Sequence, residues 1–119
     1  DNLKLAEKIS NEQIKQNKKI KLFIQVNIGD ELQKSGVSSL NIDKFYKQCT
    51  QDLGLNIIGF MCLPPNNNDV SSYFLKMKNL KINFNQHELS MGMSSDYLEA
   101  IKFESTYLRI GSKIFGQRN

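Results

Sequence analysis

The chain has 119 residues, a mass of 13.7 kDa, a formal net charge of +4 and a sequence pI near 9.1. Its 39% hydrophobic and 24% charged residues are typical of one globular domain and exclude a disordered chain or a coiled coil. Every apolar run is shorter than the ~18 residues that cross a bilayer. We therefore expect a soluble, cytoplasmic protein that has no membrane partner.

The basic charge makes three kinds of anionic partner candidates: a nucleic acid, a phosphorylated small molecule or a membrane surface. The lysines are mostly dispersed, and the one run, over residues 15–21, is explained by a solvated helix end. Cys49 and Cys62 lie among apolar residues and form no CxxC motif, which predicts two buried free thiols. His87 has no neighbouring ligands, so we expect no transition-metal site.

The apolar pattern alternates four times between helix and strand. The expected order is a helix over 3–18, a strand over 21–27, a helix over 40–53, a strand over 55–61, a helix over 70–84, a strand over 89–91, a helix over 95–102 and a strand over 106–110. Strands that alternate with helices pair in parallel through right-handed crossovers, so we expect a parallel α/β sheet. Four units form a small open sheet or half of an eight-fold barrel, because a whole barrel needs about 250 residues.

Local signals mark the expected ends of two helices. Ser39 or Asn41 can cap the helix over 40–53, and Gly54 is placed to end it. Asp96, followed three residues later by Glu99, fits a capping box for the helix over 95–102.

Two strand ends carry the residues that best suit a ligand. In parallel α/β proteins ligands collect at the carboxyl ends of strands, and here residues 92–95 and 109–112 each combine a glycine, a serine and a following helical segment. Glycine lets the backbone approach a ligand, serine donates a hydroxyl hydrogen bond, and unpaired N–H groups at a helix start attract an anion. Each loop alone is typical of a capped helix start, and two on successive units strengthen the case for a phosphate site without excluding that simpler explanation.

Arg109 is the charged residue inside an apolar strand. Two interpretations stay open: it points outward or pairs with Glu99 or Glu104, or it points inward at the strand end and faces a ligand. A guanidinium cannot give up its proton at ordinary pH. Against a heterocyclic nitrogen it would therefore keep that nitrogen unprotonated.

Four segments, in order along the chain, resemble one family. Residues 26–37 (VNIGDELQKSGV), 59–65 (GFMCLPP), 89–96 (LSMGMSSD) and 100–118 (AIKFESTYLRIGSKIFGQR) resemble motifs of the pyridoxal phosphate homeostasis proteins, the YggS or PROSC family. Together the matches span about residues 22–118. One departure is Glu104, because the family usually has glycine before the Ser-Thr pair; if that turn needs a positive φ, glutamate imposes strain of roughly 1 kcal/mol or more.

The resemblance implies a fold-type III (β/α)8 barrel, similar to the alanine racemase N-terminal domain, that holds pyridoxal 5′-phosphate (PLP) as a Schiff base on a lysine of its first strand. It implies that residues 1–119 are the second half of this barrel, strands five to eight, and that the lysine lies upstream. By the same resemblance Met93, Ser94, Gly111 and Ser112 would bind the PLP phosphate, and Arg109 would face the pyridine nitrogen.

In function, the resemblance implies a PLP carrier or buffer that supplies apo-enzymes and performs no turnover. Two alternatives stay open: a PLP-dependent racemase or decarboxylase on the same barrel, and a basic nucleic-acid-binding module. The four tyrosines show no spacing that would make a base-stacking platform, so we expect no nucleic-acid partner.

Overall fold

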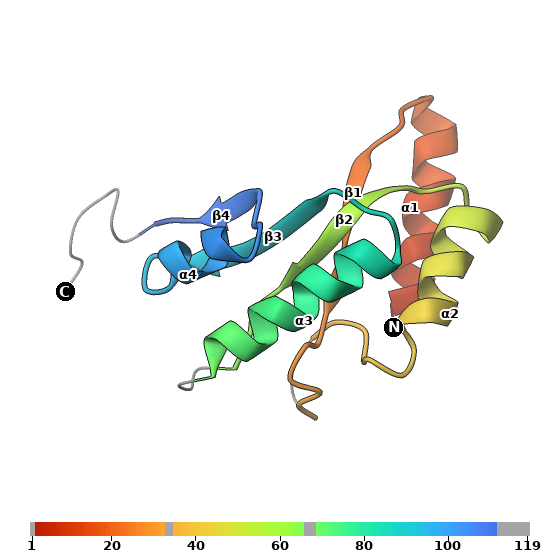
Figure 1. The fold of residues 1–119 in the computed structure, drawn as a ribbon. Helices are drawn as coiled ribbons and strands as arrows, with labels where there is room; N and C mark the ends of the chain where they lie inside the picture. The colour runs from red at the N-terminus through yellow and green to blue at the C-terminus, as the bar shows by residue number, and fades with distance from the viewer. Residues whose placement is uncertain (1, 33–34, 66–68, 112–119) are drawn as a thin grey trace.

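The computed structural model describes residues 2–32, 35–65 and 69–111. Its elements are α1 (Asn2–Gln16), β1 (Lys21–Val26), α2 (Ile42–Lys47), η1 (Gln48–Asp52), β2 (Asn56–Cys62), α3 (Val70–Asn83), β3 (Glu88–Met93), α4 (Tyr97–Lys102) and β4 (Tyr107–Arg109). The strands form one parallel sheet in the order β1-β2-β3-β4 (Figure 1). The predicted alternation and the parallel sheet are confirmed.

The second helix ends as predicted but begins differently. It continues from α2 into the π-helical turn η1, and Gly54 follows with φ +61°, the left-handed conformation that costs glycine no Cβ strain. The predicted side-chain cap is wrong, because Asn41 makes no capping bond to the helix. Ser39 instead donates its N–H and hydroxyl to the Asp30 carboxylate, at 3.0 and 2.8 Å.

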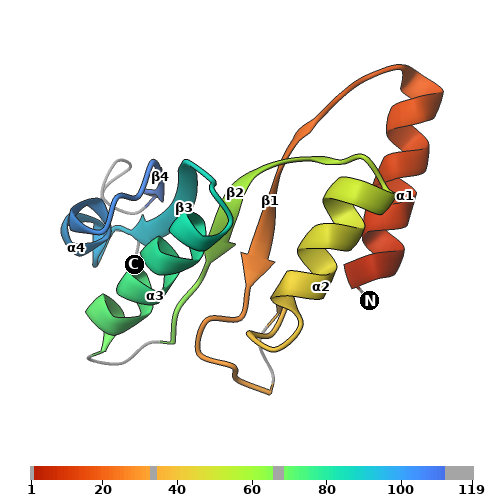
Figure 2. The same ribbon diagram turned by 45° about the vertical axis from the view of Figure 1, so that its right-hand side comes forward.

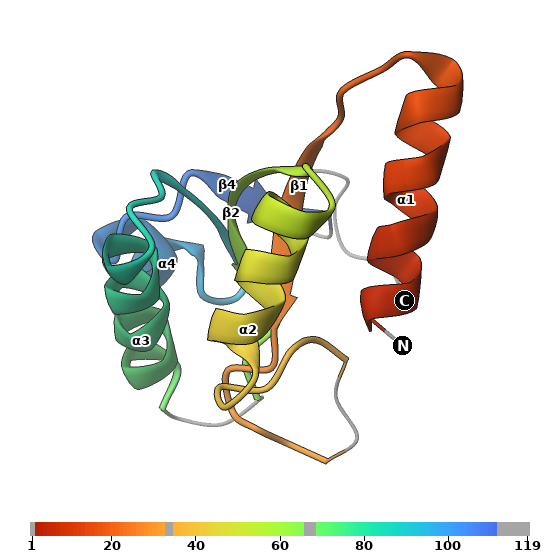
Figure 3. The same ribbon diagram turned by 90° about the vertical axis from the view of Figure 1, so that its right-hand side faces the viewer.

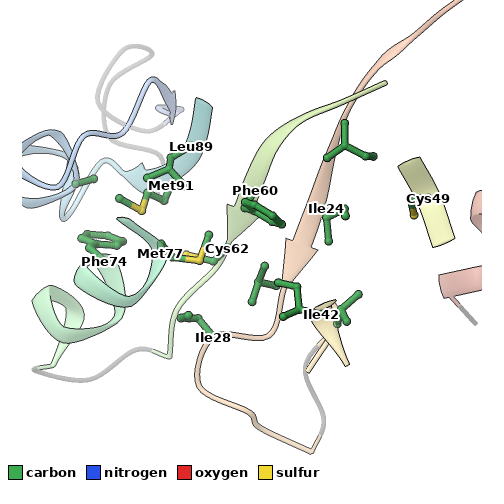
Figure 4. Close-up of a cluster of buried hydrophobic side chains, with 14 of the residues drawn as sticks. Ile24, Ile28, Ile42, Cys49, Phe60, Cys62, Phe74, Met77, Leu89 and Met91 are labelled. Atoms are coloured by element: carbon green, nitrogen blue, oxygen red, sulfur yellow. The ribbon is translucent and has the colours of Figure 1, made fainter. Parts of the chain in front are cut away.

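One face of the sheet packs against helices and forms the core. Figures 2 and 3 show α2 and α3 on this face, with α1 standing beside the β1 edge. Apolar side chains of β2 and β3 meet those of α3 here, and each side chain contributes about 1.5–3 kcal/mol by leaving water. The most deeply buried of them are Phe60, Cys62, Leu89, Met91, Phe74 and Met77 (Figure 4). Cys49 and Cys62 are buried free thiols, as predicted.

The opposite face of the sheet is concave. The rings of Phe23 on β1 and Tyr107 on β4 lie 5.1 Å apart, centroid to centroid, in an edge-to-face contact. These strands are the two outer strands, and in a flat sheet they would stand about 14 Å apart. The sheet therefore curves strongly toward this face, as a segment of a barrel wall does.

Within the described residues, no helix combines the length and the apolar character that crossing a membrane requires.

Candidate functional site

The two strand-end loops singled out in the sequence lie side by side. Met93, at the end of β3, is the register partner of Arg109, at the end of β4. The two ends share an open hollow of about 600 Å³. Its described lining residues are Met93, Ser94, Ser95, Arg109, Ile110 and Gly111. The structure thus brings together four of the five predicted site residues, and the fifth, Ser112, lies outside the described residues.

Gly92 makes this juxtaposition possible. Its φ is +104°, and a Cβ at this position would lie 2.6 Å from Cβ of Ala100 and 2.8 Å from Cδ2 of Leu108. Both distances are far inside van der Waals contact. A residue without a side chain therefore lets α4 and β4 pack closely on the end of β3, which brings the two loops together.

The turn from β3 into α4 is closed by Asp96, and the predicted capping box is wrong. Asp96 Oδ1 accepts the N–H of Met93 at 2.7 Å, and the Asp96 N–H donates to the Met93 carbonyl at 3.1 Å. Glu99 accepts the hydroxyl of Ser71 and pairs with Lys102 at 3.1 Å. The Met93 amide, expected to bind a phosphate, is therefore already occupied by a carboxylate.

Two serines of this turn have hydrogen-bond donors that no described residue uses. Within the described part of the chain, the N–H and hydroxyl groups of Ser94 and Ser95 make no hydrogen bond. Both residues line the hollow. Four neighbouring donors without an internal acceptor suit the oxygens of an anion.

Arg109 lies on the concave face, at the mouth of the hollow. Leu108 packs against the helix-covered core, so its neighbours Tyr107 and Arg109 point to the other face. The pairing of Arg109 with Glu99 or Glu104 is wrong for the described residues, where both carboxylates form ion pairs with lysines instead. Among the described lining residues, Arg109 supplies the only charge.

Glu104 holds the turn before β4 in a left-handed conformation, with φ +71°. The positive φ considered from the sequence is thus confirmed, and the residue carries the strain that glycine would avoid. Its carboxylate contacts Nζ of Lys81 at 2.6 Å and Nζ of Lys78 at 3.1 Å. Hydrogen bonds from Lys81 and then Lys78 lower the pKa of Glu104.

Sequence reasoning missed the partner of this glutamate. The side chain of Lys81 is only 11% exposed, and it lies on the buried stripe of α3 that includes Phe74 and Met77. A lysine at a position of an apolar helical stripe is the signal that could have indicated a buried ion pair.

The described lining of the hollow has hydrogen-bond donors and one positive charge but no acid–base pair. Its described lining contains no carboxylate, imidazole or thiol. Cys62, buried below the loop, is unreactive, because burial and then the charge of Asp96 raise its pKa to about 12. No cluster of three or more metal-ligating side chains occurs in the part of the chain that the structure describes.

The curved parallel sheet, with two adjacent strand ends that share one hollow, defines an α/β protein of the barrel type. The family model "Alanine racemase, N-terminal domain" matches residues 1–119, and the chain belongs to this family. A pyridoxal phosphate homeostasis protein of Aquifex aeolicus is 33% identical over 127 aligned residues, which cover 99% of this chain and 56% of that protein.

Solved structures agree with this placement. PipY of Synechococcus elongatus, determined without PLP, superposes with a TM-score of 0.85 at 25% identity and covers 94% of this chain and 57% of its own. PipY with PLP bound gives a TM-score of 0.78 at 25% identity, covering 94% and 56%. The chain has the α/β fold of the PLP-binding barrels and spans about half the length of the relatives that it matches.

Proposed function

We propose that this chain is part of a barrel that holds PLP reversibly and releases it to apo-enzymes in the cytoplasm, as a carrier or buffer of the cofactor. The observation that carries the proposal is the hollow at the ends of β3 and β4, which one arginine lines together with two serines whose donors make no hydrogen bond among the described residues. The names of the matched homeostasis proteins and the PLP-bound PipY structure support it.

The described residues fit the chemical groups of PLP. Its phosphate monoester carries a charge of about −1.5 to −2 near neutral pH and accepts several hydrogen bonds. The N–H and hydroxyl groups of Ser94 would hold it, together with Gly111 from the neighbouring strand end. Ser112, expected to bind with them, lies outside the described residues. Met93 would line the site with its half-exposed side chain, since Asp96 occupies its N–H.

Arg109 would face the pyridine nitrogen from the same edge. A guanidinium only donates hydrogen bonds, so it would keep this nitrogen unprotonated and limit the ring's capacity to withdraw electrons. Bound PLP supplies a reactive aldehyde and an electron sink, and a weakened sink suits storage better than turnover. We therefore propose that the protein is not an enzyme.

We also propose that residues 1–119 correspond to strands five to eight of the barrel. The order of the resembling motifs supports this, because the loops after strands seven and eight are the frequent phosphate site of such barrels. In this arrangement β3 and β4 are strands seven and eight. The lysine that binds PLP covalently would belong to the first strand, outside residues 1–119.

The proposal is tested by PLP titration of the chain, followed by borohydride reduction. We expect weak, reversible binding that Ser94→Ala reduces, while Ser72→Ala on α3 leaves it unchanged. We also expect no stoichiometric reduced adduct on any single lysine. A full adduct on one lysine would contradict the assignment of the lysine to another part of the barrel, and equal binding by both variants would contradict the site.

A further inference from the structure

The turn beside the hollow contains its own anion. Asp96 Oδ1 lies 2.7 Å from the N–H of Met93, in the position that a phosphate oxygen would take if this amide bound the ligand. The reciprocal bond from the Asp96 N–H to the Met93 carbonyl, 3.1 Å long, fixes the turn from both ends. The chain thus uses one amide of the loop for an internal carboxylate and leaves those of Ser94 and Ser95 to a ligand.

Within the part of the chain that the structure describes, the charge of Asp96 has no neighbouring cation. No ion pair involves Asp96 among the residues that the structure describes. Its field extends below the loop, since it is the second cause, after burial, of the raised pKa of Cys62. Arg109 brings one positive charge to the hollow, and Asp96 places one negative charge in the adjoining turn, bonded to the N–H of Met93.

We propose that Asp96 sets the affinity of this hollow for a phosphate monoester. The carboxylate is a positioning residue: it holds the N–H of Met93 and so orients the free donors of Ser94 and Ser95 toward the hollow. At the same time its negative charge opposes the dianion that they bind. This inference rests on the proposed function, because a carrier must release its ligand as readily as it takes it up.

The variant Asp96→Asn separates the hydrogen bond that Asp96 accepts from the negative charge that it carries. An asparagine side-chain oxygen still accepts the hydrogen bond from Met93, but the side chain carries no charge. One partly solvated charge acting on a dianion across several ångströms corresponds to a change of about 3- to 10-fold in the dissociation constant. A larger Asp96→Glu side chain keeps the charge and serves as the charged counterpart.

The experiment follows the amide resonances of Ser94, Ser95 and Gly111 by NMR while methyl phosphate is added. We expect Asp96→Asn to bind about 3- to 10-fold more tightly than the parent chain at low ionic strength, with a gain that shrinks as salt screens the charge. Asp96→Glu should show no gain. Asp43→Asn, which removes an exposed carboxylate on α2, controls for net charge and should also show none.

The outcomes distinguish this inference from the function on which it rests. If the parent chain binds methyl phosphate and Asp96→Asn binds equally or more weakly, Asp96 does not set the affinity and the inference fails alone. If Asp96→Asn binds methyl phosphate more tightly by a factor that salt does not change, the charge of Asp96 is not the cause, and the inference again fails alone. If neither protein shows shifts at these amides, the phosphate site and the inference both fail.

Discussion

Two glycines at the same edge of the sheet perform opposite tasks. Gly92 lies in a closed region, where a Cβ would meet Ala100 and Leu108 at less than 3 Å. Gly111, at the end of the neighbouring strand, lies in an open one, and a Cβ there would meet nothing within 4 Å among the described residues. The first glycine lets three elements pack together, and the second leaves room for a ligand.

The largest effect is expected from Gly92→Ala. A methyl group would strain a backbone at φ +104° and overlap two side chains, which together destabilise by about 2–4 kcal/mol. Urea unfolding measures the loss. Gly54→Ala is the matched control, because Gly54 also has a positive φ, +61°, but open space around it. Equal losses in the two variants would show that packing at Gly92 contributes nothing.

Gly111→Val should do the opposite of Gly92→Ala: it should weaken PLP binding and leave the free energy of unfolding almost unchanged. The added side chain enters open space, so the free energy of unfolding should stay within about 0.5 kcal/mol of the parent value. The same side chain fills part of the hollow, and PLP binding should weaken about tenfold or more. Isothermal titration with PLP and thermal unfolding measure the two properties. Unchanged PLP affinity would place the ligand elsewhere.

A smaller loss of stability is expected from Glu104→Gln, which keeps the strained φ and removes the charge that Lys81 and Lys78 contact. Glu104→Gly relieves the strain but also leaves the nearly buried Lys81 without this partner. We expect both variants to melt below the parent chain, because an unpaired buried ammonium outweighs the relief of one strained φ. A Glu104→Gly chain that melts above the parent would contradict this order.

The same ion pair predicts a pH dependence. The pKa of Glu104 is lowered in the folded chain, so its stabilising contribution is fully present above the ordinary glutamate value, 4.5, and is lost as the pH falls through the lowered folded value. Melting temperatures of the parent and Glu104→Gln should therefore converge in acid below this pH. A difference that persists unchanged at the lowest pH would show that charge is not its cause.

The smallest effect is expected for the alkylation rate of Cys62, the buried thiol near the turn that Asp96 closes. With a pKa of about 12, Cys62 is almost entirely protonated at pH 8, and it is also buried. Iodoacetamide should label it only as fast as the chain opens, as measured by mass spectrometry. Gly92→Ala should accelerate labelling, and Gly111→Val should not. Rapid labelling of the folded parent chain would show that the closed region is open in solution.

The sequence predicted the elements because their signals are local. Apolar spacing located β1, β2, β3 and β4, the strands of the described residues, and Gly54 marked the end of a helix by the conformation that it adopts. The predicted capping box is wrong because Asp96 and Glu99 accept hydrogen bonds from donors other than the amides of their own helix start. Asp96 took the N–H of Met93, and Glu99 took the hydroxyl of Ser71 on another helix.

The site was predicted only in outline for the same reason. The glycine and serine pattern indicated the two loops, and the parallel order of the strands indicated that they would be neighbours. The curvature that brings Phe23 to Tyr107 depends on how the whole sheet packs, and no local pattern contains it. The buried contact of Lys81 with Glu104 joins residues 23 positions apart, so spacing could not reveal it.

The most direct test of the account is to map PLP binding on the chain by amide chemical shifts. The largest changes should fall on Ser94, Ser95 and Gly111, and pyridoxal, which lacks the phosphate, should leave these amides nearly unchanged. Changes of equal size with pyridoxal, or changes centred on the lysines of α1 and α2, would contradict the claim that the two strand ends form a phosphate site.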